Sequence, residues 1–256
     1  MAAATGDTLW DEFERNQGVE DSAVWREMRR RWPEFFEACV HLAAVPWRRG
    51  TLSAKTRELV LVAVNAAVTH LNRNAIRTHI RNALGHGASA DEIMEVLQLI
   101  SVLGIHATSI GFPALLEVAS DTGNGQQLPG ETLDPHQQAL KRQFRESRGY
   151  WSPFWEDALK LDTPLFEAYY NFSSVPWKHG VLEPKVREFV YIAIDASTTH
   201  MFDLGTRGHM ANAFGHGATL AEILEVLELT VPIGIQSATT GLEILLEELA
   251  ARGQPV

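Results

Sequence analysis

The sequence is poor in cysteine, in basic residues and in long apolar runs, and each shortage excludes a class of protein. Cys39 is the one cysteine, so an internal disulfide and a cysteine-based metal site are excluded. Lysine and arginine total 22 against 32 acidic residues, a formal charge of −10, which argues against a nucleic-acid partner and against an anionic membrane surface. The longest apolar stretch, Leu59–Val68, is far shorter than a bilayer span.

The N-terminal segment Met1–Trp10 lacks the basic and apolar parts of a secretory signal. The composition is that of a globular protein, 45% hydrophobic and 21% charged over 256 residues. We therefore expect a soluble, cytoplasmic protein with no membrane and no nucleic-acid partner.

An internal repeat is the most informative feature of the chain. Val45–Leu97 aligns without a gap with Val175–Leu227 at a constant offset of 130 residues, and 26 of the 53 positions are identical. Such self-similarity indicates duplication of one structural unit. We predict two repeats, residues 10–119 and 135–252, joined by a linker over 120–134 that is rich in Gly, Pro, Gln and Asp.

Both repeats show helical spacing of apolar residues and no alternating strand pattern, so we predict an all-α fold. In the first copy a helix is expected over Ser53–His70 with Ser53 as its N-cap, followed by a turn at 72–74 and a helix that ends at Gly85–Gly87. The second copy places its turn at 203–205, and Pro184 suits a first helical turn.

Capping boxes are predicted where a further helix begins in each copy, at Ser89–Glu92 and Thr219–Glu222.

Polar residues that both copies keep within otherwise apolar helices are the candidates for chemistry. In the first copy they are Lys55, Arg57, Glu58, Thr69, His70, Arg77, His79, Asn82 and His86. Their counterparts are Lys185, Arg187, Glu188, Thr199, His200, Arg207, His209, Asn212 and His216. Retention in both copies fits either a folding role or a functional role.

Glu58 and His79 are candidates for a proton-handling pair, because histidine titrates near neutral pH and a carboxylate can orient it. Glu188 and His209 are the equivalent pair. Contact between Glu58 and His79 requires either a helix that folds back or the other repeat, and the spacing leaves both open. His70 and His200 are further candidate catalytic groups.

Candidate substrate-binding residues lie on the same segment as the histidine. Arginine can hold a carboxylate by two parallel hydrogen bonds. The candidates are Arg77, Asn82, Arg207 and Asn212.

Structural roles compete with each of these functional ones. Glu58 could be a solvated acid near a helix start, and His70 could satisfy carbonyls at a turn. His79 could be a buried core histidine. Residues beside the helix-ending glycines, His86 and His216, fit C-terminal caps better than catalytic groups.

Tryptophans in the repeated Val-Pro-Trp sequence, Trp47 and Trp177, fit core or interface anchors better than pocket walls. A metal site is disfavoured because the histidine spacing matches no zinc motif. A serine hydrolase is disfavoured because there is no GxSxG elbow.

The sequence resembles a tandem member of the carboxymuconolactone decarboxylase superfamily, which also contains the alkylhydroperoxidase-like D proteins. The resemblance is carried by Lys55–Ala63, Thr69-His70, His79–Ser89 and Glu92–Leu97, and by their counterparts in the second copy. It implies all-helical domains that form ring-like oligomers, with trimers for tandem members. It also implies a cofactor-free site around His79 and His209, with Glu58 and Glu188 at the glutamate positions.

Two departures from the superfamily narrow the activity. The peroxidase branch carries a CxxC pair where this chain has Asn72 and Ala75, and Phe202 and Gly205 in the second copy; without a thiolate, disulfide-based reduction is excluded. The decarboxylase branch carries His-Glu where this chain has Asn74-Ala75 and Leu204-Gly205. His70 and His200 are hypothesised to take over that acid–base role.

The leading hypothesis is a cofactor-independent lyase, a decarboxylase of a small carboxylated, lactone-like or enolisable metabolite. A hydratase, lactone hydrolase or retro-aldolase on the same site is the first alternative, and a non-catalytic ligand-binding oligomer is the second. The two copies differ at Asn65 and Asp195, at Asn72 and Phe202, and at His106 and Gln236, so one pocket could have lost activity.

Overall fold

The computed structural model describes residues 10–11, 13–14, 23–149 and 151–254. These residues form helices and turns, and no strand occurs among them, which confirms the all-α prediction. They fall into two compact units, one made of Met1–Ile100 with Val181–Val256 and the other of Ser101–Gly180. The compact units therefore cut across the two predicted repeats, whose boundaries remain a prediction about the duplication.

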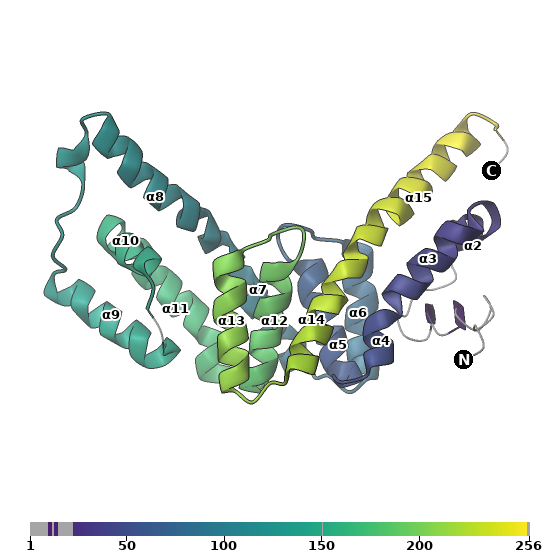
Figure 1. Cartoon of the computed structure of the whole chain (residues 1–256), viewed down its shortest axis with the longest axis horizontal. Coiled ribbons are helices and arrows are strands. Elements are labelled where there is room, and N and C mark those ends of the chain that lie inside the picture. Colours follow the sequence, from purple (N-terminus) through teal and green to yellow (C-terminus); the bar gives the residue numbers. More distant parts are fainter. Residues whose placement is uncertain (1–9, 12, 15–22, 150, 255–256) are drawn as a thin grey trace. The chain divides into compact units, whose positions relative to one another are not determined.

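The first of these units contains the core helices of both repeats (Figure 1). From the first repeat come α2 (Ala23–Arg31), α3 (Pro33–Ala43), α4 (Val45–Arg49), α5 (Ala54–Ala66), α6 (Arg73–Gly85) and α7 (Ala90–Ile100). From the second come α12 (Pro184–Ala196), α13 (Asp203–Gly215), α14 (Leu220–Thr230), the 3₁₀ turn η3 (Val231–Gly234) and α15 (Ile235–Ala251).

The predicted helix starts are confirmed. The Ser53 hydroxyl accepts a hydrogen bond from the Thr56 N–H at 3.1 Å and caps α5. Both capping boxes are present, with Ser89 and Thr219 each bonded reciprocally to the glutamate three residues later. Pro184 lies in the first turn of α12.

The predicted end of the first long helix is wrong. Helix α5 ends at Ala66 and not at His70, because Ala67 has an extended ψ of 137°. Leu71 then adopts a left-handed φ of 52°, and the Asn72 N–H bonds back to the Asn65 carbonyl at 3.0 Å. The turn expected at 72–74 is wrong for the same reason, since α6 already begins at Arg73.

The turn expected at 203–205 in the second copy is also wrong. Met201 has a φ of 54° and makes the turn, so α13 begins at Asp203. A left-handed leucine or methionine is uncommon, which is why spacing alone misplaces both turns.

Helices α5 and α12 pack against each other at the centre of the unit, so the two repeats share one core. Val60 and Val64 of α5 and Ile192 of α12 belong to a single buried apolar cluster. Both helices are buried on all sides over most of their length, as expected for helices with apolar residues all round.

Two buried carboxylates clasp the repeats together reciprocally. Glu225 of α14 accepts hydrogen bonds from the Thr51 N–H at 2.7 Å, the Leu52 N–H at 3.1 Å and Arg57 Nε at 2.5 Å. Its counterpart Glu95 of α7 accepts from the Val181 and Leu182 N–H groups and from Arg187.

Glu225 is 0% and Glu95 2% exposed, so the hydrogen bonds that join these carboxylates to the arginines of the opposite repeat are buried. Removal of one partner of such a buried ion pair lowers the free energy of unfolding strongly, because the other charge stays buried without a partner. The clasp therefore fixes the start of α5 against α14 and the start of α12 against α7.

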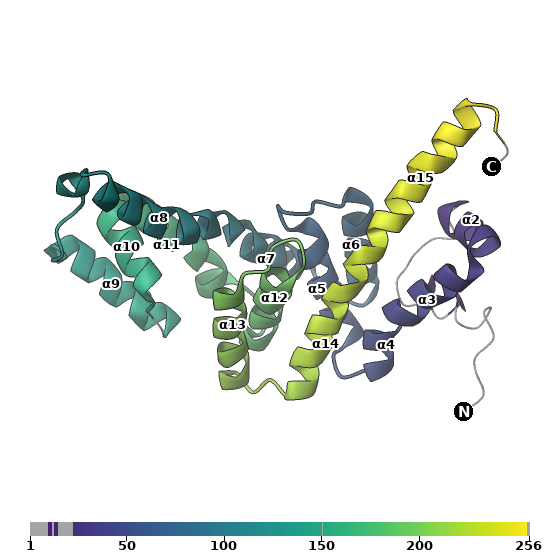
Figure 2. The ribbon, with the colours of Figure 1, turned by 45° about the horizontal axis from the view of Figure 1, so that its top comes forward.

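The long helix α15 continues the line of α14 away from the shared core (Figure 2). It packs against α2. Leu242 of α15 joins a buried aromatic cluster that includes Trp25 and Phe36 of the first repeat. The C-terminal helix of the second repeat is thereby anchored on the N-terminal helices of the first.

The second compact unit is also built from helices that pack against one another. It contains η1 (Ser101–Ile105), α8 (His106–Asp121), η2 (Gly125–Gln127), α9 (Pro135–Arg148), α10 (Pro153–Leu161) and α11 (Thr163–His179). Its core is again aromatic, with Phe144, Trp155 and Phe166 buried together with Ile105.

Two helical stretches, Ala90–Asp121 and Leu220–Ala251, are long and apolar enough to cross a membrane by length and composition. The first has a mean hydropathy of 1.7 over 18 residues and is longer than Leu59–Val68. Core helices of soluble proteins pass the same test, so the absence of a membrane partner remains a prediction.

Replacement of Glu225 by glutamine tests the clasp. The Glu225→Gln variant keeps the side-chain shape but leaves the Arg57 guanidinium buried without an opposite charge, so we expect a loss of about 3–5 kcal/mol in the free energy of unfolding. Urea denaturation followed by circular dichroism measures it. Glu228→Gln removes the neighbouring, more exposed pair with Arg49 and should cost much less; equal losses would contradict a special role for the buried clasp.

Candidate functional site

The predicted Glu58–His79 pair forms within the first repeat. Helix α6 folds back along α5, and the Oε2 atom of Glu58 lies 2.8 Å from Nδ1 of His79. Glu58 is 0% and His79 6% exposed, which overturns the alternative of a solvated acid at a helix start. Asn82 Nδ2 also approaches Glu58 Oε1, at 3.4 Å.

The hydrogen bond to Glu58 determines how the imidazole of His79 can act. A carboxylate only accepts, so Nδ1 carries the proton that is shared with Glu58. The other ring nitrogen, Nε2, is then the atom that can take up or release a proton. This is the arrangement that acid–base catalysis requires.

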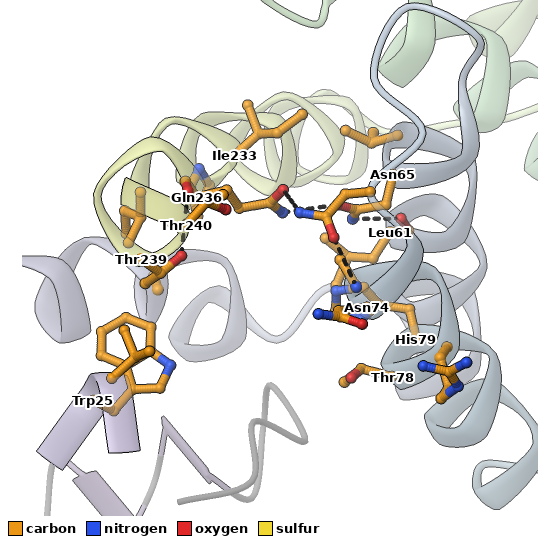
Figure 3. Close-up of a pocket in the computed structure, with 18 of the residues that line it drawn as sticks. Trp25, Leu61, Asn65, Asn74, Thr78, His79, Ile233, Gln236, Thr239 and Thr240 are labelled. Atoms are coloured by element: carbon orange, nitrogen blue, oxygen red, sulfur yellow. Dashed lines mark hydrogen bonds between the residues drawn. The ribbon is translucent and has the colours of Figure 1, made fainter. Parts of the chain in front are cut away.

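A cavity of about 420 Å³ adjoins His79. Leu61 and Trp25 contribute apolar wall from the first repeat, and Ile233 and Gln236 contribute wall from the second. Figure 3 shows Gln236 of α15 extending across to Asn65 of α5, with His79 on the neighbouring helix. The site of the first repeat is therefore completed by a helix of the second.

The second repeat reproduces the pair with a different surrounding. Nδ1 of His209 lies 2.7 Å from Oε2 of Glu188, and Asn212 approaches the same carboxylate at 3.4 Å. The imidazole stacks on Tyr191 with ring centroids 4.4 Å apart. The equivalent of Tyr191 in the first repeat is Leu61, which lines the cavity.

The two candidate arginines are in different situations. Arg77 lines the cavity beside His79 and has no ion-pair partner among the described residues. Arg207 makes an exposed ion pair with Asp203 at 2.8 Å. Asn82 approaches Glu58 and does not line this cavity, and Asn212 approaches Glu188 in the same way. Their substrate-binding role remains a prediction.

His70 and His200 lie beside the pairs and not in contact with them. His70 bonds through Nε2 to Gln236 at 2.7 Å, and it does not line the cavity. His200 Nε2 lies 3.9 Å from Asp195, and burial lowers the pKa of His200. Their proposed takeover of an acid–base role remains a prediction.

A ladder of hydrogen-bonded side-chain amides crosses the cavity wall of the first repeat, and single sequence motifs did not predict it. Asn65 donates to the Leu61 carbonyl at 2.8 Å and accepts from Gln236 Nε2 at 2.7 Å. Gln236 Oε1 accepts from Asn72 Nδ2 at 2.5 Å and from His70. The signal that could have found it is the set of differences between the copies, at Asn65, Asn72 and Gln236.

A buried carboxylate replaces part of this ladder in the second repeat. Asp195, the counterpart of Asn65, is 1% exposed, and its Oδ2 lies 3.9 Å from His209 Nε2. Burial raises the pKa of Asp195 to about 7, and the positive charge of His209 opposes the rise. A Cβ at Gly205 would overlap Asp195 Oδ2 and the Phe202 ring, so a larger residue there would displace these side chains.

Asp195 and His200 offer a carboxylate oxygen and an imidazole nitrogen 3.9 Å apart. The expectation that the protein needs no metal remains a prediction.

Two further histidines of the retained set, and Cys39 outside it, have structural positions. His86 and His216 are the exposed C-caps of α6 and α13, as expected. Cys39 is 4% exposed in the aromatic cluster, and burial raises the pKa of its thiol, which is the state of a core cysteine and not of a thiolate nucleophile.

Comparisons with known proteins agree with the duplicated architecture. A sequence model described as "Carboxymuconolactone decarboxylase family" matches residues 33–119 and 163–247, one match in each predicted repeat. A crystal structure from Burkholderia xenovorans LB400, described as a "putative gamma-carboxymuconolactone decarboxylase subunit", superposes with a TM-score of 0.90 at 42% sequence identity, covering 98% of this chain and 100% of that chain. An uncharacterized protein of Methanocaldococcus jannaschii is 28% identical over 95 residues, 37% of this chain and 87% of the relative.

Replacement of Asp195 by asparagine tests the buried carboxylate. Because its pKa is about 7 in the folded protein and 3.8 ordinarily, the folded state holds the proton more tightly between these values. The contribution of Asp195 to the free energy of unfolding is therefore largest below pH 4. It falls by up to about 4 kcal/mol as the pH rises to 7.

The Asp195→Asn variant should lose this fall, which urea denaturation at a series of pH values between 4 and 8 measures. The exposed Asp203 serves as the control, since Asp203→Asn should keep the wild-type profile. An Asp195→Asn profile that is parallel to the wild-type profile would refute the raised pKa.

Proposed function

The chain belongs to the carboxymuconolactone decarboxylase family, and from that premise we propose that it is a cofactor-independent lyase. Its proposed reaction is decarboxylation of a small carboxylated, lactone-like or enolisable metabolite by histidine–glutamate acid–base catalysis. The observation that carries the proposal is the buried Glu58–His79 pair on the wall of a cavity that Arg77 also lines. The structural relative described as a decarboxylase subunit supports the reaction class.

Arg77 holds the substrate carboxylate. Arg77 lines the cavity and stands two residues before His79 on the same helix. A guanidinium binds a carboxylate by two parallel hydrogen bonds. The substrate is thereby placed with its reacting carbon on the side of the imidazole.

His79 supplies the proton that replaces the lost carboxyl group. The bond between the carbon and the carboxyl group breaks, carbon dioxide leaves, and the electron pair stays on the substrate. Protonated Nε2 of His79 then transfers its proton to the carbon, and Glu58 stabilises the imidazolium before the transfer. The apolar walls formed by Leu61 and Ile233 disfavour the charged ground state.

The first repeat is the proposed working site. Its arginine lines the cavity, whereas Arg207 is paired with Asp203. Nε2 of His209 faces the carboxylate of Asp195 at 3.9 Å, and a nearby carboxylate disfavours an anionic substrate.

We also propose a homo-oligomer, with a trimer favoured by the family resemblance. Large apolar residues are exposed on the outer helix of each unit, Ile110, Leu115 and Val118 on α8 and Ile244 and Leu245 on α15. Apolar surface of this kind is typical of protein–protein interfaces. A cytoplasmic location without nucleic-acid partners is part of the same proposal.

Turnover of carboxylated γ-lactones by three variants tests the proposed site. Loss of the general acid in His79→Asn should lower kcat by about 10²- to 10⁴-fold. Loss of the orienting charge in Glu58→Gln should lower it about 10- to 100-fold, by analogy with groups that orient metal-bound histidines. Release of carbon dioxide and the product mass distinguish decarboxylation from hydration, lactone hydrolysis or retro-aldol cleavage.

The matched control is His209→Asn in the second repeat, which should retain wild-type turnover. Circular dichroism and melting temperature establish that each variant is folded. Unchanged turnover in His79→Asn would refute the catalytic assignment, and loss in His209→Asn alone would move it to the second repeat.

A further inference from the structure

We propose that Gln236 and Asn72 bind the substrate oxygen on which negative charge develops during the reaction. The inference rests on the proposed function of His79 and adds the group that accepts the electron pair. Gln236 comes from the C-terminal helix of the second repeat, and Asn72 from the N-cap of α6 in the first. The proposal narrows the substrate class to carboxylic acids that carry a second carbonyl group. This carbonyl group is conjugated to the bond between the carbon and the carboxyl group, or lies one carbon away from it.

The orientation of the amide ladder is imposed from both ends. The Leu61 carbonyl can only accept, so Asn65 turns its NH₂ group toward it and its oxygen toward Gln236. The Ala75 N–H can only donate, and it bonds to the Asn72 oxygen at 3.1 Å, so the Asn72 NH₂ group faces Gln236. Both ends therefore require the same orientation of the Gln236 amide.

Each of the two amides keeps one N–H group that the ladder does not use. An NH₂ group has two hydrogens, and the ladder takes one from Gln236 and one from Asn72. Among the described residues no acceptor is assigned to the second hydrogen of either group. Both residues line the cavity together with His79.

The acceptor capacity of Gln236, in contrast, is fully used. Its oxygen has two lone pairs and accepts from both Asn72 and His70. Two hydrogen bonds to the oxygen polarise the amide and strengthen its N–H groups as donors. The ladder thus offers a ligand donors and no charge, which suits an oxygen atom that becomes negative.

An electron acceptor of this kind is what decarboxylation without a cofactor needs. When the carbon–carboxyl bond breaks, its electron pair moves into the conjugated system and forms an enolate oxygen, which the two N–H groups bind. Carbon dioxide carries away the carboxyl carbon and both of its oxygens. His79 then transfers a proton to the carbon, the enolate returns to the carbonyl, and the imidazole is protonated again from solvent.

The site around His209 lacks the Asn72 donor. Phe202 replaces Asn72, and Asp195 replaces Asn65. A phenyl ring donates no hydrogen bond to an oxygen, and a buried carboxylate would repel an enolate. The oxygen-binding site is accordingly a property of the first repeat.

Binding of 3-nitropropionate tests the proposal without a known substrate. Its ionised form is a planar nitronate, which resembles an enolate, attached to a carboxylate that Arg77 can hold. Isothermal titration calorimetry compares the nitronate with propionate, which has the carboxylate alone. We expect the wild-type protein to bind the nitronate at least about 100-fold more tightly than propionate, since hydrogen bonds to a charged oxygen are strong.

Two variants of Gln236 should remove this preference. In Gln236→Leu we expect the ratio of the two affinities to fall about 10- to 100-fold, with the affinity for propionate unchanged. Gln236→Glu is isosteric and places a carboxylate in the ladder, so it should lower the ratio further and serves if the leucine variant does not fold. Because both ligands are measured in the same variant, a merely structural role would lower both affinities and leave the ratio unchanged.

The duplicated chain supplies the matched control. His106 is the counterpart of Gln236, and His106→Leu should leave the ratio within about twofold of the wild-type value. A wild-type protein without the preference, or a Gln236→Leu variant that keeps it, would overturn the proposal. Turnover by His79→Asn reports separately on the proposed function, so that failure of one can be told from failure of the other.

Discussion

The reciprocal bonds from Glu225 and Glu95 to the opposite repeat are the interaction on which the rest of the structure depends. Each carboxylate gathers two backbone N–H groups and an arginine that would otherwise be buried without an acceptor. The bonds hold α14 against the start of α5, and α15 extends from α14. The clasp therefore contributes to holding Gln236 on the wall beside His79, together with the packing of α15 on α2.

Much of the fold could be predicted because its signals are local. The helix caps at Ser53 and Thr219 depend on residues within one turn of each other, and the structure confirms both. The early end of α5 at Ala67 and the turn after it could not be predicted, since the turn uses a left-handed φ at Leu71, a conformation that favours glycine or asparagine. Repeat comparison also singled out Glu58 and His79, because polar residues kept in apolar helices stand out.

The composition of the cavity wall could not be predicted from one repeat at a time. Gln236 lies more than 160 residues from its partners Asn65 and Asn72, and no periodicity connects positions so far apart. The copies have diverged at these positions while the Glu–His pairs stayed the same. A neutral amide ladder in one copy and a buried carboxylate in the other give two imidazoles of the same geometry different electrostatic surroundings.

The origin of Gln236 in the second half of the chain has a consequence for how the site assembles. In a protein with a single repeat, the same wall could be completed only by another molecule, and the fraction of complete sites would depend on protein concentration. Covalent fusion makes that encounter intramolecular and gives the partner helix a high effective concentration. Dilution therefore leaves the pocket beside His79 intact. The fusion also allows the site around His209 to diverge while the two repeats stay together.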